Sequence, residues 1–122
     1  MPKTILVADD EPFVLRSLEF ILKKEGYNVI TATNGQEAYD RILAQKPDLV
    51  LLDIQMPKLD GNSVCRQLRE EPSTAHLYII MITAKGQEVD RVNSLESGAN
   101  EFITKPFSPR KVVTRVKEIL GE

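Results

Sequence analysis

Five short apolar stretches, rich in β-branched residues, recur along the chain and alternate with segments of helical spacing. The stretches cover residues 4–8, 27–32, 48–52, 77–82 and 100–104. Between them, apolar residues recur at intervals of three or four, as on the buried face of an amphipathic helix. This alternation predicts one parallel sheet, because each helix carries the chain back across the sheet before the next parallel strand begins.

The distribution of apolar residues favours the strand order 2-1-3-4-5, although periodicity alone does not fix it. Stretches 48–52 and 77–82 are nearly continuously apolar, which is typical of central strands covered on both faces. We therefore predict an α/β fold: a doubly wound, five-stranded parallel sheet of the flavodoxin-like type, between two helical layers. The helix after the fourth strand would use Val89, Val92 and Leu95, and with so few apolar residues it is expected to be held least firmly.

Capping residues predict where several helices begin and end. Asn34 and Glu37 have the spacing of a capping box. Ser108 is expected as an N-cap, with Pro109 at the first helical position. Gly26 is expected just past a helix end, where a left-handed conformation is common.

Length, charge and cysteine content exclude several classes of protein. The chain has 122 residues, which suits a single domain over residues 1–122. Its net charge of −2 and the lack of a long basic run give no reason to expect binding to nucleic acid or to a membrane surface. No apolar run approaches a membrane span, and the start has no signal-peptide pattern. The single cysteine, Cys65, excludes an internal disulfide, so we expect a cytoplasmic location.

Functional side chains follow the strands at one edge of the predicted sheet. Asp9 and Asp10 end the first strand and Asp53 ends the third, where this strand order places its switch point. Thr83 ends the fourth strand and Lys105 ends the fifth. Clustered carboxylates repel one another unless a cation such as Mg²⁺ offsets them. With no glycine-rich phosphate loop in the chain, these groups indicate transfer of one phosphoryl group onto a carboxylate.

Each of these residues also has an ordinary structural explanation. Taken alone, Asp10 is better explained as a helix cap, by roughly two to one. Asp53 could belong to a turn, Thr83 could satisfy backbone groups at a strand end, and Lys105 could be a solvated charge. Taken together they favour a site, because all of them fall at the strand carboxyl ends.

The order and spacing of these motifs resemble those of response regulator receiver domains over essentially the whole chain. The matching segments are residues 5–12, 51–57 with Asp60-Gly61, 82–84, 98–99 and 105–107. The resemblance implies a phosphorelay function, in which Asp53 would accept a phosphoryl group from a phosphohistidine. Asp9, Asp10 and Asp53 would hold Mg²⁺, or Mn²⁺ as the alternative ion, with the backbone carbonyl of Gln55. Lys105 would bind a phosphoryl oxygen.

The resemblance also implies a conformational switch. Thr83 would move toward the phosphate, and Phe102 stands where the family carries a rotating aromatic residue. Their movement would remodel the face made by the fourth helix, the fifth strand and the last helix. The peptide bond before Pro106 would be cis. Gln55 and Lys85 occupy two variable positions that tune hydrolysis of the phosphoaspartate, in a direction that the residues do not reveal.

The partners implied are proteins: a sensor histidine kinase or histidine phosphotransfer protein, and an unknown downstream target. Docking is expected around Phe13, Leu15 and the loop of residues 106–108. The chain is expected to be a monomer or a phosphorylation-dependent dimer, and no enzyme beyond its own phosphorylation and dephosphorylation. Because it ends just after the last helix, we expect a stand-alone regulator or relay intermediate. The alternative is a receiver excised from a transcription factor or hybrid kinase.

Two other classes of protein share part of this pattern. A phosphatase of the haloacid dehalogenase type also uses an aspartate nucleophile and Mg²⁺, but needs a second acid two residues later, where this chain has Gln55. A flavodoxin-like cofactor binder needs a loop rich in Ser, Thr and Gly after the first strand, where this chain has acidic residues that would repel a phosphate without a metal.

Overall fold

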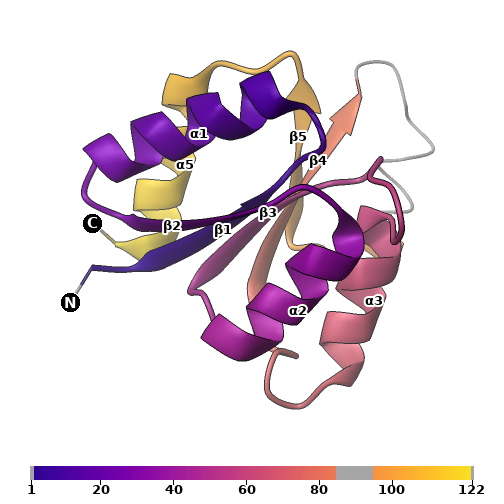
Figure 1. The fold of residues 1–122 in the computed structure, drawn as a ribbon. Helices are drawn as coiled ribbons and strands as arrows, with labels where there is room; N and C mark the ends of the chain where they lie inside the picture. The colour runs from indigo at the N-terminus through magenta and orange to yellow at the C-terminus, as the bar shows by residue number, and fades with distance from the viewer. Residues whose placement is uncertain (1, 85–94, 122) are drawn as a thin grey trace.

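The computed structural model describes residues 2–84 and 95–121, in which one parallel sheet lies between two layers of helices (Figure 1). The strands lie side by side in the order β2-β1-β3-β4-β5, as predicted. Helices α1 and α5 cover one face, while α2 and α3 cover the other. In chain order the elements are β1 Thr4–Ala8, α1 Pro12–Lys24, β2 Asn28–Ala32, α2 Gly35–Gln45, β3 Leu49–Asp53, α3 Gly61–Glu70, β4 Tyr78–Ala84, β5 Glu101–Lys105 and α5 Pro109–Leu120.

The central strand β3 is apolar throughout because it contributes to a core on each side of the sheet. Leu49 and Leu51 pack in the cluster beneath α1 and α5, whereas Val50 and Leu52 pack in the cluster beneath α2 and α3. All four are fully buried. Burying a side chain of this size contributes about 1.5–3 kcal/mol, so the two clusters together fix the middle of the sheet.

The strands extend past the apolar stretches to the functional residues at their carboxyl ends. The apolar stretches stop one residue before Asp53, Thr83 and Lys105, and strands β3, β4 and β5 include these residues, as predicted. Asp53 lies opposite Ile82, and Lys105 lies opposite Ala84. Asp53, Thr83 and Lys105 therefore project from strands, whereas Asp9 and Asp10 follow directly after the end of β1.

The predicted capping residues are found at the helix ends, with one difference. Asn34 Oδ1 accepts a hydrogen bond from the N–H of Glu37 (2.8 Å), and Glu37 Oε1 accepts one from the N–H of Thr33 (2.8 Å). Gly26 follows α1 with φ of +98°. Ser108 occupies the N-cap of α5, but its side chain makes no capping hydrogen bond. There the backbone carbonyl of Ser108 accepts the N–H of Val112 (3.3 Å).

Helix α3 begins in close contact with the end of β3. Asp60 caps the helix by accepting the N–H of Ser63 (2.9 Å). Gly61 donates its N–H to the carbonyl of Ile54 (2.9 Å). A Cβ atom at Gly61 would lie only 2.5 Å from the backbone oxygen of Asp53, so only glycine fits here without displacing the backbone that carries Asp53.

The predicted fourth helix lies mostly outside the described residues, since Val89 and Val92 fall between residues 84 and 95. Leu95, the last apolar residue of that prediction, is 51% exposed. Among the helices that the structure describes, none has the length and apolar composition needed to cross a bilayer.

Gly61→Ala is expected to lower the free energy of unfolding by about 1–3 kcal/mol, because the added methyl group would overpack the contact with β3. At an ordinary helical position the same change raises stability by about 1 kcal/mol, so the sign is informative. Urea denaturation measures the difference. Gln67→Ala, at an exposed position of α3, serves as the control and should stay within about 0.5 kcal/mol of the parent. Equal or higher stability of Gly61→Ala would contradict the tight contact.

Candidate functional site

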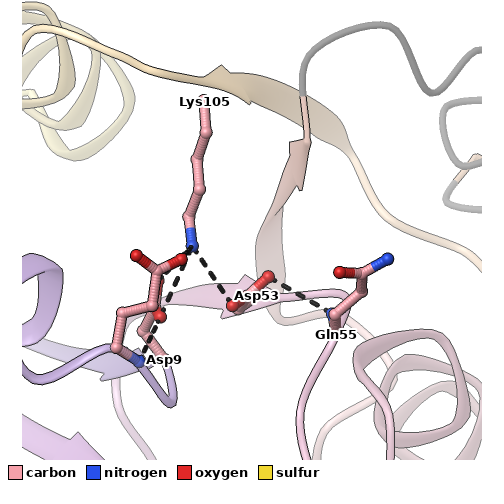
Figure 2. Close-up of polar contacts among 5 residues, drawn as sticks. Asp9, Asp53, Gln55 and Lys105 are labelled. Atoms are coloured by element: carbon pink, nitrogen blue, oxygen red, sulfur yellow. Dashed lines mark hydrogen bonds and ion pairs between the residues drawn. The ribbon is translucent and has the colours of Figure 1, made fainter.

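The carboxyl ends of β1, β3 and β5 bring two aspartates and a lysine together (Figure 2). The Lys105 ammonium lies 3.1 Å from Asp9 Oδ2 and 3.3 Å from Asp53 Oδ2. Asp9 is fully buried and Asp53 is 6% exposed. Asp9 and Asp53 are 44 positions apart in sequence, and Asp53 and Lys105 are 52 positions apart. They share one buried ion-pair cluster because β1 lies beside β3 in the sheet and the Lys105 side chain reaches both aspartates from the end of β5.

The backbone holds both aspartates in place. Asp9 Oδ1 accepts the N–H of Glu11 (2.8 Å), and Asp53 Oδ1 accepts the N–H of Gln55 (3.2 Å). In each case the carboxylate bonds to the backbone two residues later, as Asp commonly does where a strand turns into a loop. The second carboxylate oxygen of each residue is left facing Lys105.

Glu11 adds a third carboxylate to the Lys105 ammonium. Its Oε1 lies 2.7 Å from Lys105 Nζ, the shortest of the three ion pairs. Unlike Asp9 and Asp53, the Glu11 side chain is 59% exposed. Glu11 also occupies the N-cap of α1 without making a side-chain capping bond, so its carboxylate is directed to the site rather than to the helix.

Burial raises the pKa of Asp53 to about 7, and the neighbouring charge of Asp9 adds to the increase. Lys105 and the N–H of Gln55 act in the opposite direction but do not cancel it. For Lys105, burial works to lower the pKa. The combined attraction of Glu11, Asp53 and Asp9 outweighs burial and raises the pKa of the ammonium above its usual value. The site is thus short of positive charge even with Lys105 in place.

The acidic residues fit a divalent cation. Carboxylate oxygens of Asp9, Asp10 and Asp53 all lie within 4.8 Å of one another. Asp9 Oδ2 is buried and accepts no hydrogen bond from the described residues, although the Lys105 ammonium is 3.1 Å away. Asp10 is exposed and is not the cap of α1, since that position belongs to Glu11. A buried carboxylate oxygen without a hydrogen bond, beside two further carboxylates, is the ligand type that Mg²⁺ prefers.

The predicted switch residues Thr83 and Phe102 lie on the paired strands β4 and β5. Thr83 is buried, and its hydroxyl donates a long hydrogen bond (3.5 Å) to the hydroxyl of Thr104 on β5. Phe102 is half-buried and packs against the cluster beneath α2 and α3. It lies opposite Met81 in the β4–β5 register, so both switch positions belong to the same pair of strands.

Gln55 and Pro106, two further predicted residues, lie at the same edge of the sheet. Gln55 contacts Asp53 through its backbone, while its side chain is exposed. The peptide bond between Lys105 and Pro106 is cis. Lys85, predicted to tune hydrolysis, lies outside the described residues.

An apolar groove of about 510 Å³ borders the site between the start of α1 and the loop before α5. Phe13, Pro106 and Phe107 line it, and Glu11 and Lys105 form its edge toward the carboxylates. Phe13 is 84% exposed, as its predicted role in docking requires. The prediction for Leu15 is wrong: Leu15 is buried in the cluster beneath α1 and α5.

Sequence reasoning did not single out Glu11 as a partner of Lys105, or Gly61 as a contact of Asp53. The sequence feature that could have indicated a role for Glu11 in the site is its position directly after Asp9 and Asp10 and before Pro12, at the start of a helix. For Gly61 no signal distinguished a close backbone contact from an ordinary turn.

Comparisons with known proteins agree on the family. The model of the response regulator receiver domain matches residues 5–117. The alkaline phosphatase synthesis transcriptional regulatory protein PhoP of Bacillus subtilis is 50% identical over 120 residues, which are 98% of this chain and 49% of PhoP. The chain therefore spans about half the length of this curated relative.

Solved structures give the same result. A response regulator of Chloroflexus aurantiacus is 38% identical, with a TM-score of 0.93 and all of both chains covered. The receiver domain of a sensor histidine kinase of Pseudomonas aeruginosa, described with a magnesium ion coordinated in the active site cleft, is 30% identical, with a TM-score of 0.91 and all of both chains covered. These relationships favour neither a phosphatase nor a flavin binder, and the chain belongs to the family of response regulator receiver domains.

Proposed function

We propose that this receiver domain accepts a phosphoryl group from a phosphohistidine onto the carboxylate of Asp53. The single observation that carries the proposal is the position of Asp53: nearly buried, beside a second carboxylate, and 3.3 Å from an ammonium group. The chain would act as a signalling domain and not as an enzyme with a separate substrate.

The proposed reaction moves one phosphoryl group between two side chains. An oxygen of ionised Asp53 forms a bond to phosphorus while the bond from phosphorus to the histidine nitrogen breaks. The electron pair of that bond stays with the imidazole, which leaves as neutral histidine when its other ring nitrogen carries a proton. Lys105 stands where it can neutralise a phosphoryl oxygen, so the protein contributes position and charge.

Asp9, Asp10 and Asp53 would hold Mg²⁺, with the backbone carbonyl of Gln55 as a further oxygen ligand. When bound, the ion would offset the repulsion among the carboxylates and the charge of the phosphoryl group. The buried Oδ2 of Asp9, which accepts no hydrogen bond from the described residues, supports this assignment. Mn²⁺ prefers similar ligands and is the alternative ion.

Thr83 and Phe102 would transmit the change. A phosphoryl group on Asp53 offers the Thr83 hydroxyl a stronger acceptor than Thr104, because hydrogen bonds to charged groups are shorter and stronger than neutral ones. Phe102 lies on the strand paired with that of Thr83, so movement of Thr83 would alter the packing beside it. The signal would leave through the face made by β5, α5 and the segment between β4 and β5.

A histidine kinase or a histidine phosphotransfer protein would supply the phosphoryl group, docking on the apolar groove beside the site. Phe13 and Phe107 offer apolar side chains there, and the groove reaches the site at Glu11 and Lys105. The downstream target would be a protein, reached by a monomer or by a phosphorylation-dependent dimer.

Two settings fit this chemistry. A stand-alone regulator or relay intermediate would act by protein contact alone. The relationship with PhoP favours the second setting, a receiver within a longer transcriptional regulator, since the matching region is only 49% of PhoP. The complete coding sequence distinguishes the two settings.

Incubation with acetyl phosphate and Mg²⁺ is expected to give one phosphoryl adduct by intact-mass analysis, and Asp53→Asn is expected to give none. Phosphoramidate, which carries a phosphorus–nitrogen bond as phosphohistidine does, should give the same adduct. Asp40→Asn, at an exposed position of α2, is the matched control and should react like the parent protein. An adduct that persists in Asp53→Asn, or that forms equally well in EDTA, would contradict the proposed acceptor or the proposed ion.

The raised pKa of Asp53 also makes stability depend on pH when no divalent cation is present. Folded Asp53 keeps its proton up to about pH 7, whereas the unfolded chain loses it near the ordinary value of 3.8. The stability that this difference provides is fully present below pH 3.8 and is lost as the pH rises through 7. Asn at this position cannot ionise and so keeps its stability.

In EDTA, Asp53→Asn is therefore expected to gain about 2–4 kcal/mol in free energy of unfolding relative to the parent between pH 5 and pH 8. Urea denaturation across this pH range measures the change. Mg²⁺ at pH 8 should stabilise the parent more than the variant, because it binds the ionised folded form. Asp40→Asn should follow the parent at every pH. Parallel curves for Asp53→Asn and the parent would show that Asp53 ionises normally.

A further inference from the structure

The Lys105 ammonium is divided among three carboxylates that differ in how easily they can release it. Asp9 and Asp53 are nearly inaccessible to water, so separating either from Lys105 would leave a buried charge without compensation. Glu11 makes the shortest contact, 2.7 Å, but its side chain is 59% exposed. Water can replace Lys105 around Glu11 at little cost, so this is the ion pair that can be exchanged.

The backbone keeps Glu11 within reach of Lys105. Its N–H donates to Asp9 Oδ1 (2.8 Å), which anchors the start of α1 to the buried aspartate. The backbone of Glu11 is thus held in place, while its exposed side chain is the part that can change partners. Glu11 and Lys105 both line the small pocket at Asp53 and the apolar groove next to it, so their ion pair lies on the boundary between the two.

A phosphoryl group on Asp53 would compete directly with Glu11 for the same ammonium. It would bring extra negative charge to the side of Lys105 that faces Asp53. The Lys105 ammonium has about three N–H donors to share, and it cannot move toward the phosphoryl group and stay close to Glu11 at the same time. A contact present only before phosphorylation stabilises the unphosphorylated state and therefore weakens binding of the phosphoryl group.

From this geometry we infer that Glu11 is a positioning residue that restrains Lys105, through an ion pair that must break when Asp53 is phosphorylated. The inference rests on the proposed function. It means that Glu11 affects how tightly the site at Asp53 binds a phosphoryl group. Removing the carboxylate of Glu11 would free Lys105 for the phosphoryl group and strengthen occupancy of the site.

The test compares equilibrium binding of beryllofluoride, an inorganic mimic of the phosphoryl group, at saturating Mg²⁺ by NMR titration. Glu11→Gln removes the charge, and Glu11→Asp keeps the charge but shortens the side chain so that the 2.7 Å contact is lost. Both variants are expected to bind beryllofluoride about two- to fivefold more tightly than the parent, the range of a partly exposed ion pair. Glu19→Gln removes one charge from the exposed side of the same helix and should bind like the parent.

The outcomes separate this inference from the proposed function. If the parent protein binds no beryllofluoride, the proposed function fails. If the parent binds and both Glu11 variants bind equally or more weakly, Glu11 does not restrain Lys105. Tighter binding by Glu11→Gln alone would also overturn the inference, because the gain would then come from the lower negative charge of the site and not from the lost contact. The rate of adduct formation with acetyl phosphate should rise in the same two variants.

Discussion

Repulsion between two buried carboxylates governs this structure. Asp9 and Asp53 face each other at the ends of neighbouring strands, and each could be accommodated alone, but together they need a cation. Lys105 supplies one positive charge from β5, yet burial, with the charge of Asp9 added, still raises the pKa of Asp53. Further positive charge would favour the ionised form of Asp53, so the site is suited to a metal ion. Burial and the repulsion together make the free protein sensitive to the protonation of Asp53.

The rest of the fold holds these charges in place. Both hydrophobic clusters meet at β3, whose buried leucines and valine leave Asp53 at a fixed depth in the sheet. Gly61 lets α3 begin against the backbone of Asp53, and the N–H of Glu11 fixes Asp9 from the other side. Repelling carboxylates stay close together because the apolar contacts of the two layers outweigh their repulsion.

The sequence predicts the sheet well because its signals are local or strongly periodic. The continuous apolar run of β3 identifies a central strand, and Asn34 and Glu37 mark a helix start whatever surrounds them. The errors arise where tertiary packing decides. Val14 lies four residues before Leu18 and Leu15 lies three residues before it, and both spacings are typical of one helix face. Only the packing of the cluster shows that Leu15 is the more deeply buried of the two. The ion pair between Glu11 and Lys105 joins residues 94 positions apart and leaves no periodic trace.

The groove beside the site has a consequence for how such domains diversify. Its apolar lining comes from Phe13 on α1 and from Phe107 in the loop before α5, whereas Asp53 and Lys105 end strands β3 and β5 and Asp9 directly follows β1. Substitutions on the helix and the loop can alter the groove without disturbing the core that sets the acceptor geometry. A duplicated copy of this domain can therefore acquire a new donor and become insulated from the old one while its reactive centre stays the same.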